Sequence, residues 1–141
     1  MEAPRLIGVY EHTLDDKGRV TLPVKFRGYF EGPVVLADIK QAHAPCVRVY
    51  TSAAWDTFVQ LRVEGLDDFD DPEAGMRRRR INNAAYEVEV DKQGRVLLPA
   101  TMIEYFGLSR GASVLIAGNG THLEIWDPET YKRLVAQGAE V

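Results

Sequence analysis

The stretch DDKGRVTLP, residues Asp15–Pro23, returns later in the chain as DKQGRVLLP, residues Asp91–Pro99. The two copies lie 76 residues apart, and eight of the sixteen positions from 15 to 30 are identical to those from 91 to 106. A repeat at a fixed offset marks a chain built from copies of one structural unit. The sequence therefore predicts two units joined by a partly helical linker: residues 5–60, the linker 61–83, and residues 84–136.

Each copy of the repeated stretch has the pattern of a tight β-hairpin followed by a helix. Asp stands at the first position of the turn and Gly at the fourth, and Arg begins the return strand. An acid at the first position accepts backbone N–H bonds, and glycine adopts the positive φ that a bulged hairpin needs. The Leu-Pro pair that follows keeps the leucine extended and suits the first turn of a helix. The predicted strands are Leu6–Asp15 with Arg19–Leu22, and Ala85–Asp91 with Arg95–Leu98.

Local patterns predict the other elements of both units. The helix Val24–Phe30 is expected to be weaker than its counterpart Ala100–Phe106, because Gly28 costs about 1 kcal/mol of helix propensity. Asn119-Gly120 predicts a hairpin turn. The remaining predicted elements are strands at Val34–Ile39, Cys46–Tyr50, Val114–Ala117 and Leu123–Trp126, and amphipathic helices at Ser52–Val63 and Pro128–Gln137, with Trp55 and Tyr131 buried.

The linker has two parts of opposite charge. The first part is an acidic, solvated loop that includes Asp67–Glu73, and Pro72 opens a predicted helix that carries Arg77–Arg80. Four consecutive positions of a helix point around its whole circumference, so these arginines cannot all face one partner. Arg77 and Arg80 share a face because they are three residues apart. They are therefore candidate phosphate contacts, and a solvated helix explains the run equally well.

These elements predict a mainly β fold with short helices, of the α+β class. Each unit is too small to bury a good core alone, so we expect the two to pack as a pseudo-twofold pair in one β-barrel-like domain. The sheet edges and the apolar faces of Trp55 and Trp126 are expected to need partners from another subunit. We therefore expect a homo-oligomer, and a closed ring would leave no exposed ends.

Composition and charge limit the class of protein. No apolar run approaches the roughly 20 residues of a transmembrane helix, and the single cysteine, Cys46, fits a reducing compartment. We therefore expect a cytoplasmic protein with no membrane partner. The formal net charge of −4 is unlike that of a generic nucleic-acid coat. It still allows a local basic surface, because exposed charges are screened within about 10 Å at 0.1 M salt.

The acid and the arginine of the repeated turn allow two interpretations. In the structural one, each Asp caps its turn and pairs with the Arg four positions on. In the functional one, Arg19 and Arg95 offer a planar fork that binds phosphate or guanine in bidentate geometry, and the acid holds that fork in one rotamer. A purely structural turn would tolerate lysine, yet arginine stands at both places. The repetition therefore favours a nucleic-acid interface.

The same residues resemble the signatures of the MraZ family. YEHTLDDKGRVTLPVKFR, VDKQGRVLLPA, HAPCVRVYTSAAW and GNGTHLEIWDPETY look like pieces of that family, so the resemblance covers nearly the whole chain. It implies two AbrB-like swapped-hairpin units in a ring-like homo-oligomer. It also implies a bacterial transcription regulator, chiefly a repressor, located at the nucleoid. The implied partner is double-stranded DNA, as short tandem repeats in the promoter of the cell-division and cell-wall gene cluster.

Carried over position by position, the resemblance places the DNA contacts in the two turns. These contacts are Asp15, Lys17 and Arg19 in the first turn and Asp91, Lys92 and Arg95 in the second, with the two lysines as phosphate contacts. The family usually places apolar residues among the basic ones of the linker helix, whereas this chain has four arginines in a row. That departure leaves open whether Arg77 and Arg80 face DNA or another subunit.

Two other functions compete with DNA binding. A ring-forming interaction module, antitoxin-like or scaffold, would keep its function after loss of Arg19 and Arg95. A hydrolase would need Asp15 and Asp91 as a desolvated carboxylate dyad, and turn tips beside Lys and Arg do not desolvate them. Cys46 has no visible His-plus-acid framework and is expected to be a buried structural thiol. The histidines, His12, His43 and His122, lack metal spacing. We therefore expect no enzyme, no cofactor, no metal and no small-molecule substrate.

Overall fold

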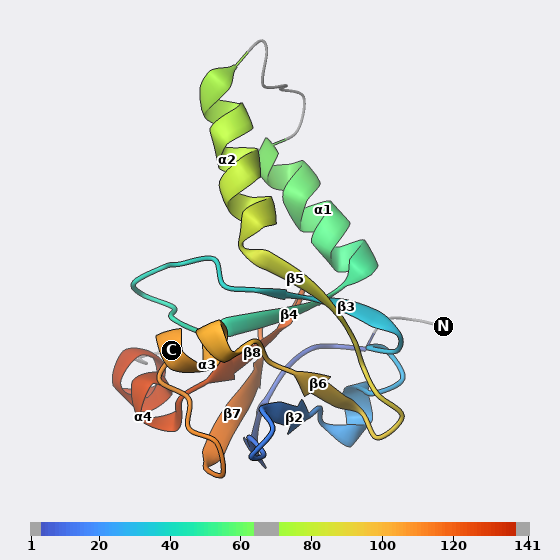
Figure 1. The fold of residues 1–141 in the computed structure, drawn as a ribbon, viewed down its shortest axis with the longest axis vertical. Coiled ribbons are helices and arrows are strands. Elements are labelled where there is room, and N and C mark those ends of the chain that lie inside the picture. Colours follow the sequence, from blue (N-terminus) through green and yellow to red (C-terminus); the bar gives the residue numbers. More distant parts are fainter. Residues whose placement is uncertain (1–3, 64–70, 138–141) are drawn as a thin grey trace.

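The structure, a computed structural model, describes residues 4–63 and 71–137. Short strands alternate with short helices along the chain (Figure 1). The strands are β1 (Val9–Thr13), β2 (Arg19–Thr21), β3 (Pro33–Ala37), β4 (Val47–Thr51), β5 (Ala85–Glu89), β6 (Arg95–Leu97), β7 (Ser113–Gly118) and β8 (Leu123–Trp126). The helices are the 3-10 helix η1 (Val24–Phe26), α1 (Ser52–Val63), α2 (Pro72–Asn83), α3 (Ala100–Tyr105), α4 (Pro128–Tyr131) and the π-helical segment η2 (Lys132–Ala136).

Six of the strands form one antiparallel sheet in the order β1-β7-β8-β4-β3-β5, and β2 pairs with β6 in a separate two-stranded sheet. The repeat organises both sheets. Val20 lies opposite Val96 in the two-stranded sheet, and Arg48 lies opposite Glu124 at the centre of the larger one. Each pair consists of residues 76 positions apart, so a pseudo-twofold axis passes through both pairs.

The two units exchange their first strands. β1 of the first unit pairs with β7 of the second, and β5 of the second unit pairs with β3 of the first. The turns are exchanged in the same way, because the Leu22 amide donates to Gly94 at 2.8 Å and the Leu98 amide donates to Gly18 at 2.8 Å. This pattern confirms the predicted mainly β, swapped-hairpin fold. The described pairings leave β1 and β5 as the sheet edges and do not join them into a closed barrel.

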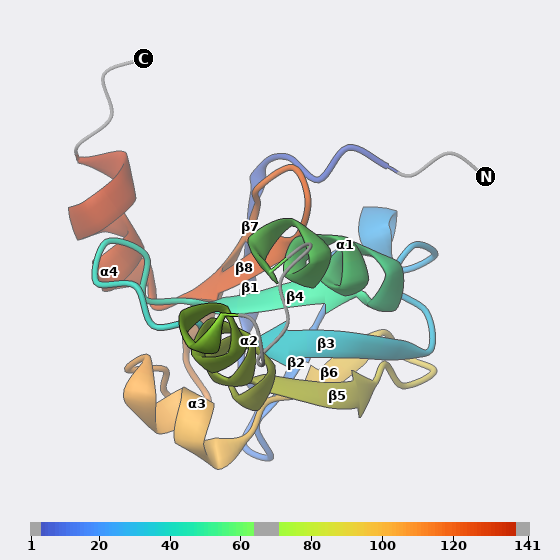
Figure 2. The ribbon, with the colours of Figure 1, turned by 90° about the horizontal axis from the view of Figure 1, so that it is seen from above.

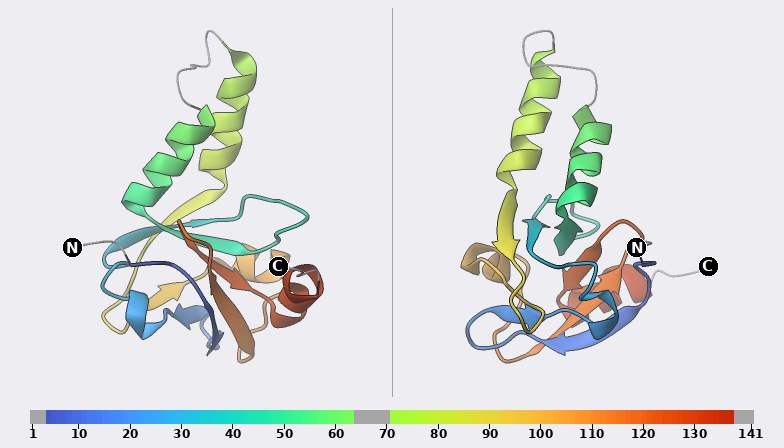
Figure 3. Two further views of the ribbon diagram at one scale, coloured as in Figure 1. Left: turned by 180° about the vertical axis from the view of Figure 1, so that it is seen from behind. Right: turned by 90° about the vertical axis from the view of Figure 1, so that its right-hand side faces the viewer.

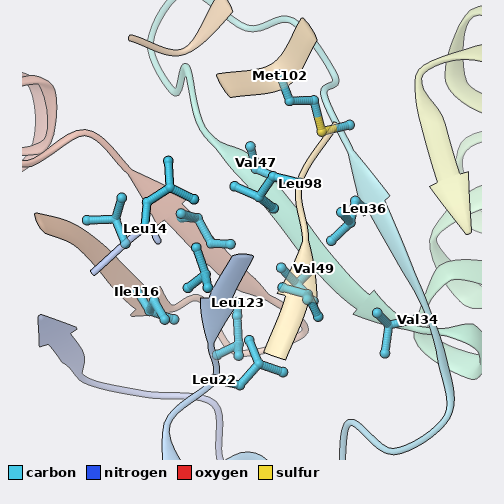
Figure 4. Packing of buried hydrophobic residues seen from close by; sticks show 14 of the residues in the cluster. Leu14, Leu22, Val34, Leu36, Val47, Val49, Leu98, Met102, Ile116 and Leu123 are labelled. Atoms are coloured by element: carbon cyan, nitrogen blue, oxygen red, sulfur yellow. The ribbon is translucent and has the colours of Figure 1, made fainter. Parts of the chain in front are cut away.

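The main core lies between the two sheets. Alternation places every second side chain of a strand on one face, so Val34 and Leu36 of β3 point to this core together with Val20 and Val96 of the two-stranded sheet. Figure 4 shows apolar side chains of this core, among them Leu22, Leu36 and Leu98, converging from segments that are far apart in sequence. Many of them are fully buried, which is how two units of modest size share one core.

α1, α2 and α4 cover the opposite face of the six-stranded sheet, whereas η1 and α3 bury Phe26 and Met102 in the main core. α1 and α2 rise from the sheet as an arm, and α4 lies beside the β7 and β8 end (Figures 2 and 3). Trp55 packs with Tyr50 and Ile81 beneath the arm, and Trp126 packs with Cys46 under α4. Trp126 is 2% exposed and Trp55 7% exposed in the single chain. The expectation that both tryptophans need a second subunit was therefore wrong, because helices of the same chain cover them.

Several predicted elements differ in detail from the structure. The weaker first helix is a single 3-10 turn, Val24–Phe26, and does not reach residue 30. Tyr131 is only partly buried, although its ring packs edge-on with that of Trp126, with centroids 5.6 Å apart. The helix that Pro72 opens is confirmed, and Asp71 caps it by accepting from Glu73 and Ala74. The acidic residues 64–70 lie outside the described residues. No helix among the residues described is long and apolar enough to cross a bilayer.

Gly118→Ala is expected to destabilise the fold by about 1–3 kcal/mol, the usual cost of overpacking. A Cβ at Gly118 would meet the backbone of Leu6 and Ile7, which runs beside β7 and cannot move aside as a side chain would. Gly28→Ala is the matched control, because a Cβ there meets nothing within 4 Å. Urea denaturation of both variants checks this; equal midpoints would contradict it.

Candidate nucleic-acid interface

The first repeated turn is a closed network around one carboxylate. Asp15 Oδ1 accepts from the backbone amides of Lys17 at 3.0 Å and Arg19 at 2.8 Å. Asp15 Oδ2 accepts from Arg19 Nε at 2.7 Å. The Gly18 amide closes the turn on the Asp15 carbonyl at 3.0 Å, and Gly18 has a φ of 87°. The bulged turn predicted from the sequence is confirmed.

The second turn repeats the first bond by bond. Asp91 accepts from the amides of Gln93 and Arg95, both at 2.9 Å, and from Arg95 Nε at 2.7 Å. Gly94 has a φ of 76°. The arginine side chain of each pair is 29% exposed. Two sequences that differ at the turn tip therefore build the same arginine geometry.

The acids of both turns are held in their charged form. The hydrogen bond from the backbone amide of Arg19 is the largest of the causes that set the pKa of Asp15 below its ordinary value, and the amide of Arg95 does the same for Asp91. A carboxylate dyad would raise one pKa of the pair, so these two acids do not have the electrostatics of a catalytic dyad. Each instead fixes its own arginine through Nε.

The Nε atoms of Arg19 and Arg95 donate to the acids of their own turns. Their terminal nitrogens, Nη1 and Nη2, bond to no other group in the described part of the chain. Arg19 lies opposite Leu97, and Arg95 lies opposite Thr21. Paired residues of a ladder share one face of a sheet, so both arginines stand on the face opposite the buried Val20 and Val96. From strand geometry their Cα atoms are roughly 8 Å apart. The ribbon thus presents two fixed guanidinium forks side by side.

Sequence reasoning missed two further arginines that the exchange of strands brings to the turns. Arg27, after η1 of the first unit, lies against the second turn: a Cβ at Gly94 would be 2.6 Å from Arg27 Cδ. Its Nε donates to the Leu22 carbonyl at 3.0 Å. Arg110 of the second unit lies near the first turn, with Nη2 3.7 Å from a Cβ built at Gly18. Each turn therefore has a second cation nearby from the opposite unit. No local motif marks these residues, because only tertiary pairing places them.

The other predicted contacts are divided between two regions. Lys17 and Lys92 are exposed at the tips of their turns, at the third and second turn positions respectively. Arg77 and Arg80 lie on α2, whose Ile81 packs on the sheet face opposite the core that holds β2 and β6. The structure therefore brings the lysines together with the turns and leaves the α2 arginines apart from them.

A buried polar cluster lies on the outer face of β8, and sequence reasoning did not find it. Glu124, 8% exposed, accepts from Trp126 Nε1 at 3.0 Å, Asn119 Nδ2 at 3.0 Å and His122 Nε2 at 3.1 Å. Burial acts to raise the pKa of Glu124, but the three donated bonds outweigh it and hold the pKa below its ordinary value. His122 also stacks on Tyr50, with ring centroids 4.7 Å apart. The cluster has the features of a structural element, since all its polar atoms are satisfied.

The thiol of Cys46 is buried as predicted, and burial raises its pKa. In the described residues, no three His, Cys, Asp or Glu side chains are grouped as metal ligands would be.

Comparison with known proteins places the chain among one set of relatives. The family model for the MraZ protein, described as antitoxin-like, matches residues 6–77 and 81–141. A transcriptional regulator MraZ from Thermomicrobium roseum is 34% identical over 139 residues, which cover 96% of this chain and 93% of that one. The protein of the same name from Leuconostoc citreum is 34% identical, with 95% and 89% covered. The one from Limosilactobacillus fermentum is 36% identical, with 89% and 82% covered.

Proposed function

The chain belongs to the MraZ family, and from that premise we propose that it binds duplex DNA sequence-specifically through its two arginine turns. Relatives that match most of the chain are named transcriptional regulators. The chain is accordingly a regulator of transcription and not an enzyme.

One observation carries the proposal: Arg19 and Arg95 stand on the same outward face of the β2–β6 ribbon, each with Nε held by an acid and Nη1 and Nη2 unpaired among the residues described. A two-stranded ribbon fits the major groove, and a bidentate arginine is the commonest specific contact to guanine. The acid removes rotamer freedom before DNA arrives, which lowers the entropic cost of binding.

The rest of the ribbon surface supports the same mode of binding. Thr21 and Leu97 share the outward face with the arginines, and Leu97 is 54% exposed. An apolar side chain beside two arginines suits contact with a thymine methyl group, and a threonine accepts or donates to base edges. Lys17 and Lys92 at the tips, with Arg27 and Arg110 beside the turns, supply phosphate contacts that fix the register.

Arg19→Ala and Arg95→Ala are each expected to weaken specific binding by about 1–3 kcal/mol, the value of one good bidentate base contact. Folding should be kept, because an exposed ion pair contributes only about 0–1 kcal/mol. A gel shift on the DNA upstream of the protein's own gene, at two salt concentrations, measures this.

Two variants serve as controls for this experiment. Lys17→Ala should weaken binding to all sequences alike and reduce the salt slope by about one. Lys132→Ala, exposed on η2, should leave binding unchanged. If both arginine variants bind the operator as the wild type does, the turns are structural and a protein-interaction module, antitoxin-like or scaffold, takes the place of DNA binding.

The proposal extends to assembly and targets. We expect a ring-shaped homo-oligomer that acts in the cytoplasm at the nucleoid, chiefly as a repressor of the cell-division and cell-wall gene cluster through tandem promoter repeats. The exposed edges β1 and β5, with Val9 of β1 48% exposed, support association between copies. Sedimentation of a monomer at micromolar concentration would contradict the ring.

A further inference from the structure

A hollow of about 760 Å³ lies at the base of the arm, where α2, β5, α3 and the residues after β3 meet. We name it the α2–α3 hollow and define it by Lys40, Arg77, Arg80, Tyr86, Thr101 and Tyr105, which are among its lining residues. Figure 1 shows α3 below the end of α2 from which β5 begins. Its volume falls in the range of about 300–1,000 Å³ typical of small-molecule sites.

One wall of the hollow, α2, belongs to the linker and not to the repeat. α2 has no copy in the repeat, and at the offset of 76 the positions of Tyr86, Thr101 and Tyr105 fall on Tyr10, Lys25 and Tyr29. Tyr10 packs edge-on to Phe26 in the core, whereas Tyr86 and Tyr105 are 41% and 55% exposed. Both tyrosines thus recur in the first unit, where they are partly buried, and in the second unit they are exposed at the hollow.

The charges of the hollow are strongly unbalanced. Its lining side chains include the cations of Lys40, Arg77 and Arg80 and one carboxylate, that of Asp38. The side chains of Arg77 and Arg80 make no hydrogen bond or ion pair within residues 4–63 and 71–137. Their guanidinium groups are therefore free to take an anion of about two charges.

The remaining walls are aromatic and apolar. Lys40 Nζ lies over the Tyr105 ring, 4.7 Å from its centre, and this cation–π contact helps to fix the ring in place. Tyr86 offers a second exposed ring, and the hydroxyl of Thr101 offers a donor and acceptor. Flat rings next to paired arginines suit a ligand with an aromatic base at one end and phosphates at the other.

We propose that the α2–α3 hollow binds a free nucleoside diphosphate, with its base on the tyrosine rings and its phosphates on Arg77 and Arg80. This assignment is independent of the DNA contacts proposed for the turns. It accounts for the two α2 arginines that lie apart from the β2–β6 ribbon. It also places the ligand against α3, whose Ile103 side chain would be 3.1 Å from a Cβ at Gly18.

Isothermal titration of the full chain with ADP, GDP, UDP and CDP, in the absence of DNA, tests the proposal. At least one should bind saturably with a Kd below roughly 1 mM. The matching nucleoside and inorganic pyrophosphate alone should each bind about tenfold more weakly or worse, because each lacks half of the contacts. Absence of saturable binding by all four diphosphates would overturn the proposal.

Variants assign the site. Arg77→Gln with Arg80→Gln should weaken binding about tenfold or more, and Tyr105→Ala about fivefold or more. Lys132→Gln with Arg133→Gln, which removes the same charge from exposed positions of η2, should change nothing. An equal loss in this control pair, or pyrophosphate binding as tightly as the diphosphates, would mean that only charge is sensed and would refute a nucleotide site.

A DNA-binding measurement on the same variants distinguishes nucleotide phosphates from DNA phosphates as the ligand of the α2 arginines. The Arg77→Gln, Arg80→Gln pair should keep the wild-type affinity and salt slope for the operator. If it instead flattens the salt slope by about two while no nucleotide binds, the α2 arginines are DNA phosphate contacts and the proposal is wrong.

Discussion

Glu124→Ala should lower the free energy of unfolding by about 2–5 kcal/mol, because each buried donor left without an acceptor costs about 1–3 kcal/mol. The carboxylate of Glu124 accepts from Trp126, Asn119 and His122 while 8% exposed. Alanine would leave the donors of Trp126 and His122 buried without an acceptor, whereas Asn119 is exposed and can bond to water. Urea denaturation at neutral pH, followed by far-ultraviolet circular dichroism, measures the loss.

Two variants control this result. Glu124→Gln keeps the shape of the side chain and one acceptor oxygen. Its free energy of unfolding should therefore fall by only about 1–3 kcal/mol, the cost of leaving one buried donor without an acceptor. Glu129→Ala, exposed on α4, should stay within about 0.5 kcal/mol of the wild type. A Glu124→Ala protein as stable as the Glu129→Ala protein would show that the cluster is not structural.

The carboxylate of Glu124 also makes the stability of the fold depend on pH. Since the folded pKa of Glu124 lies below its ordinary value, its contribution is present above that ordinary value and is lost as the pH falls through the folded pKa. Glu124→Gln should therefore show a smaller fall in stability on acidification than the wild type does.

Inserting half a helical turn between tandem operator repeats is expected to reduce affinity by a factor on the order of 10² to 10⁴. One subunit offers few base-reading side chains, and a chain of net charge −4 gains little from non-specific phosphate contacts. An oligomer presents the ribbon again at a fixed spacing, so contacts after the first become intramolecular. The repeats should then lie about 10 bp apart, so that all ribbons meet one side of the duplex.

Gel shifts on three promoter fragments measure the effect: one with the native spacing, one with about 5 bp inserted and one with about 10 bp inserted. The longer insertion restores the face of the duplex and should recover much of the affinity. Equal binding to all three fragments, or to a single repeat, would show that each subunit reads DNA alone.

The repeated stretch predicted the fold because its information is local. The Asp, Gly, Arg and Leu-Pro positions each act within a few residues, and the structure has the predicted turn at both places. The burial of Trp126 could not be predicted, because its cover comes from α4 and Cys46 of the same chain and depends on how strands are exchanged. Local sequence patterns show that an apolar side chain will be buried, but they do not show which distant segment packs on it.

The candidate interface was predictable to the same extent. Arg19 and Arg95 stand out because the motif occurs twice. Arg27 and Arg110 do not, because each lies beside a turn of the opposite unit. The placement of Arg77 and Arg80 away from the turns likewise follows from where α2 packs, and helix periodicity alone shows only that the two share a face.

Because the strands are exchanged within one chain, the DNA site that the ribbon reads does not have to be a palindrome. Two identical chains related by a true twofold would have to read a palindrome, since each half presents the same side chains. Here the halves share one polypeptide and have diverged, with Thr21 on one side of the axis where Leu97 stands on the other. The ribbon can therefore tell one end of its site from the other. If it reads DNA as proposed, its operator has a direction, and every subunit of a ring would meet successive repeats in the same polarity.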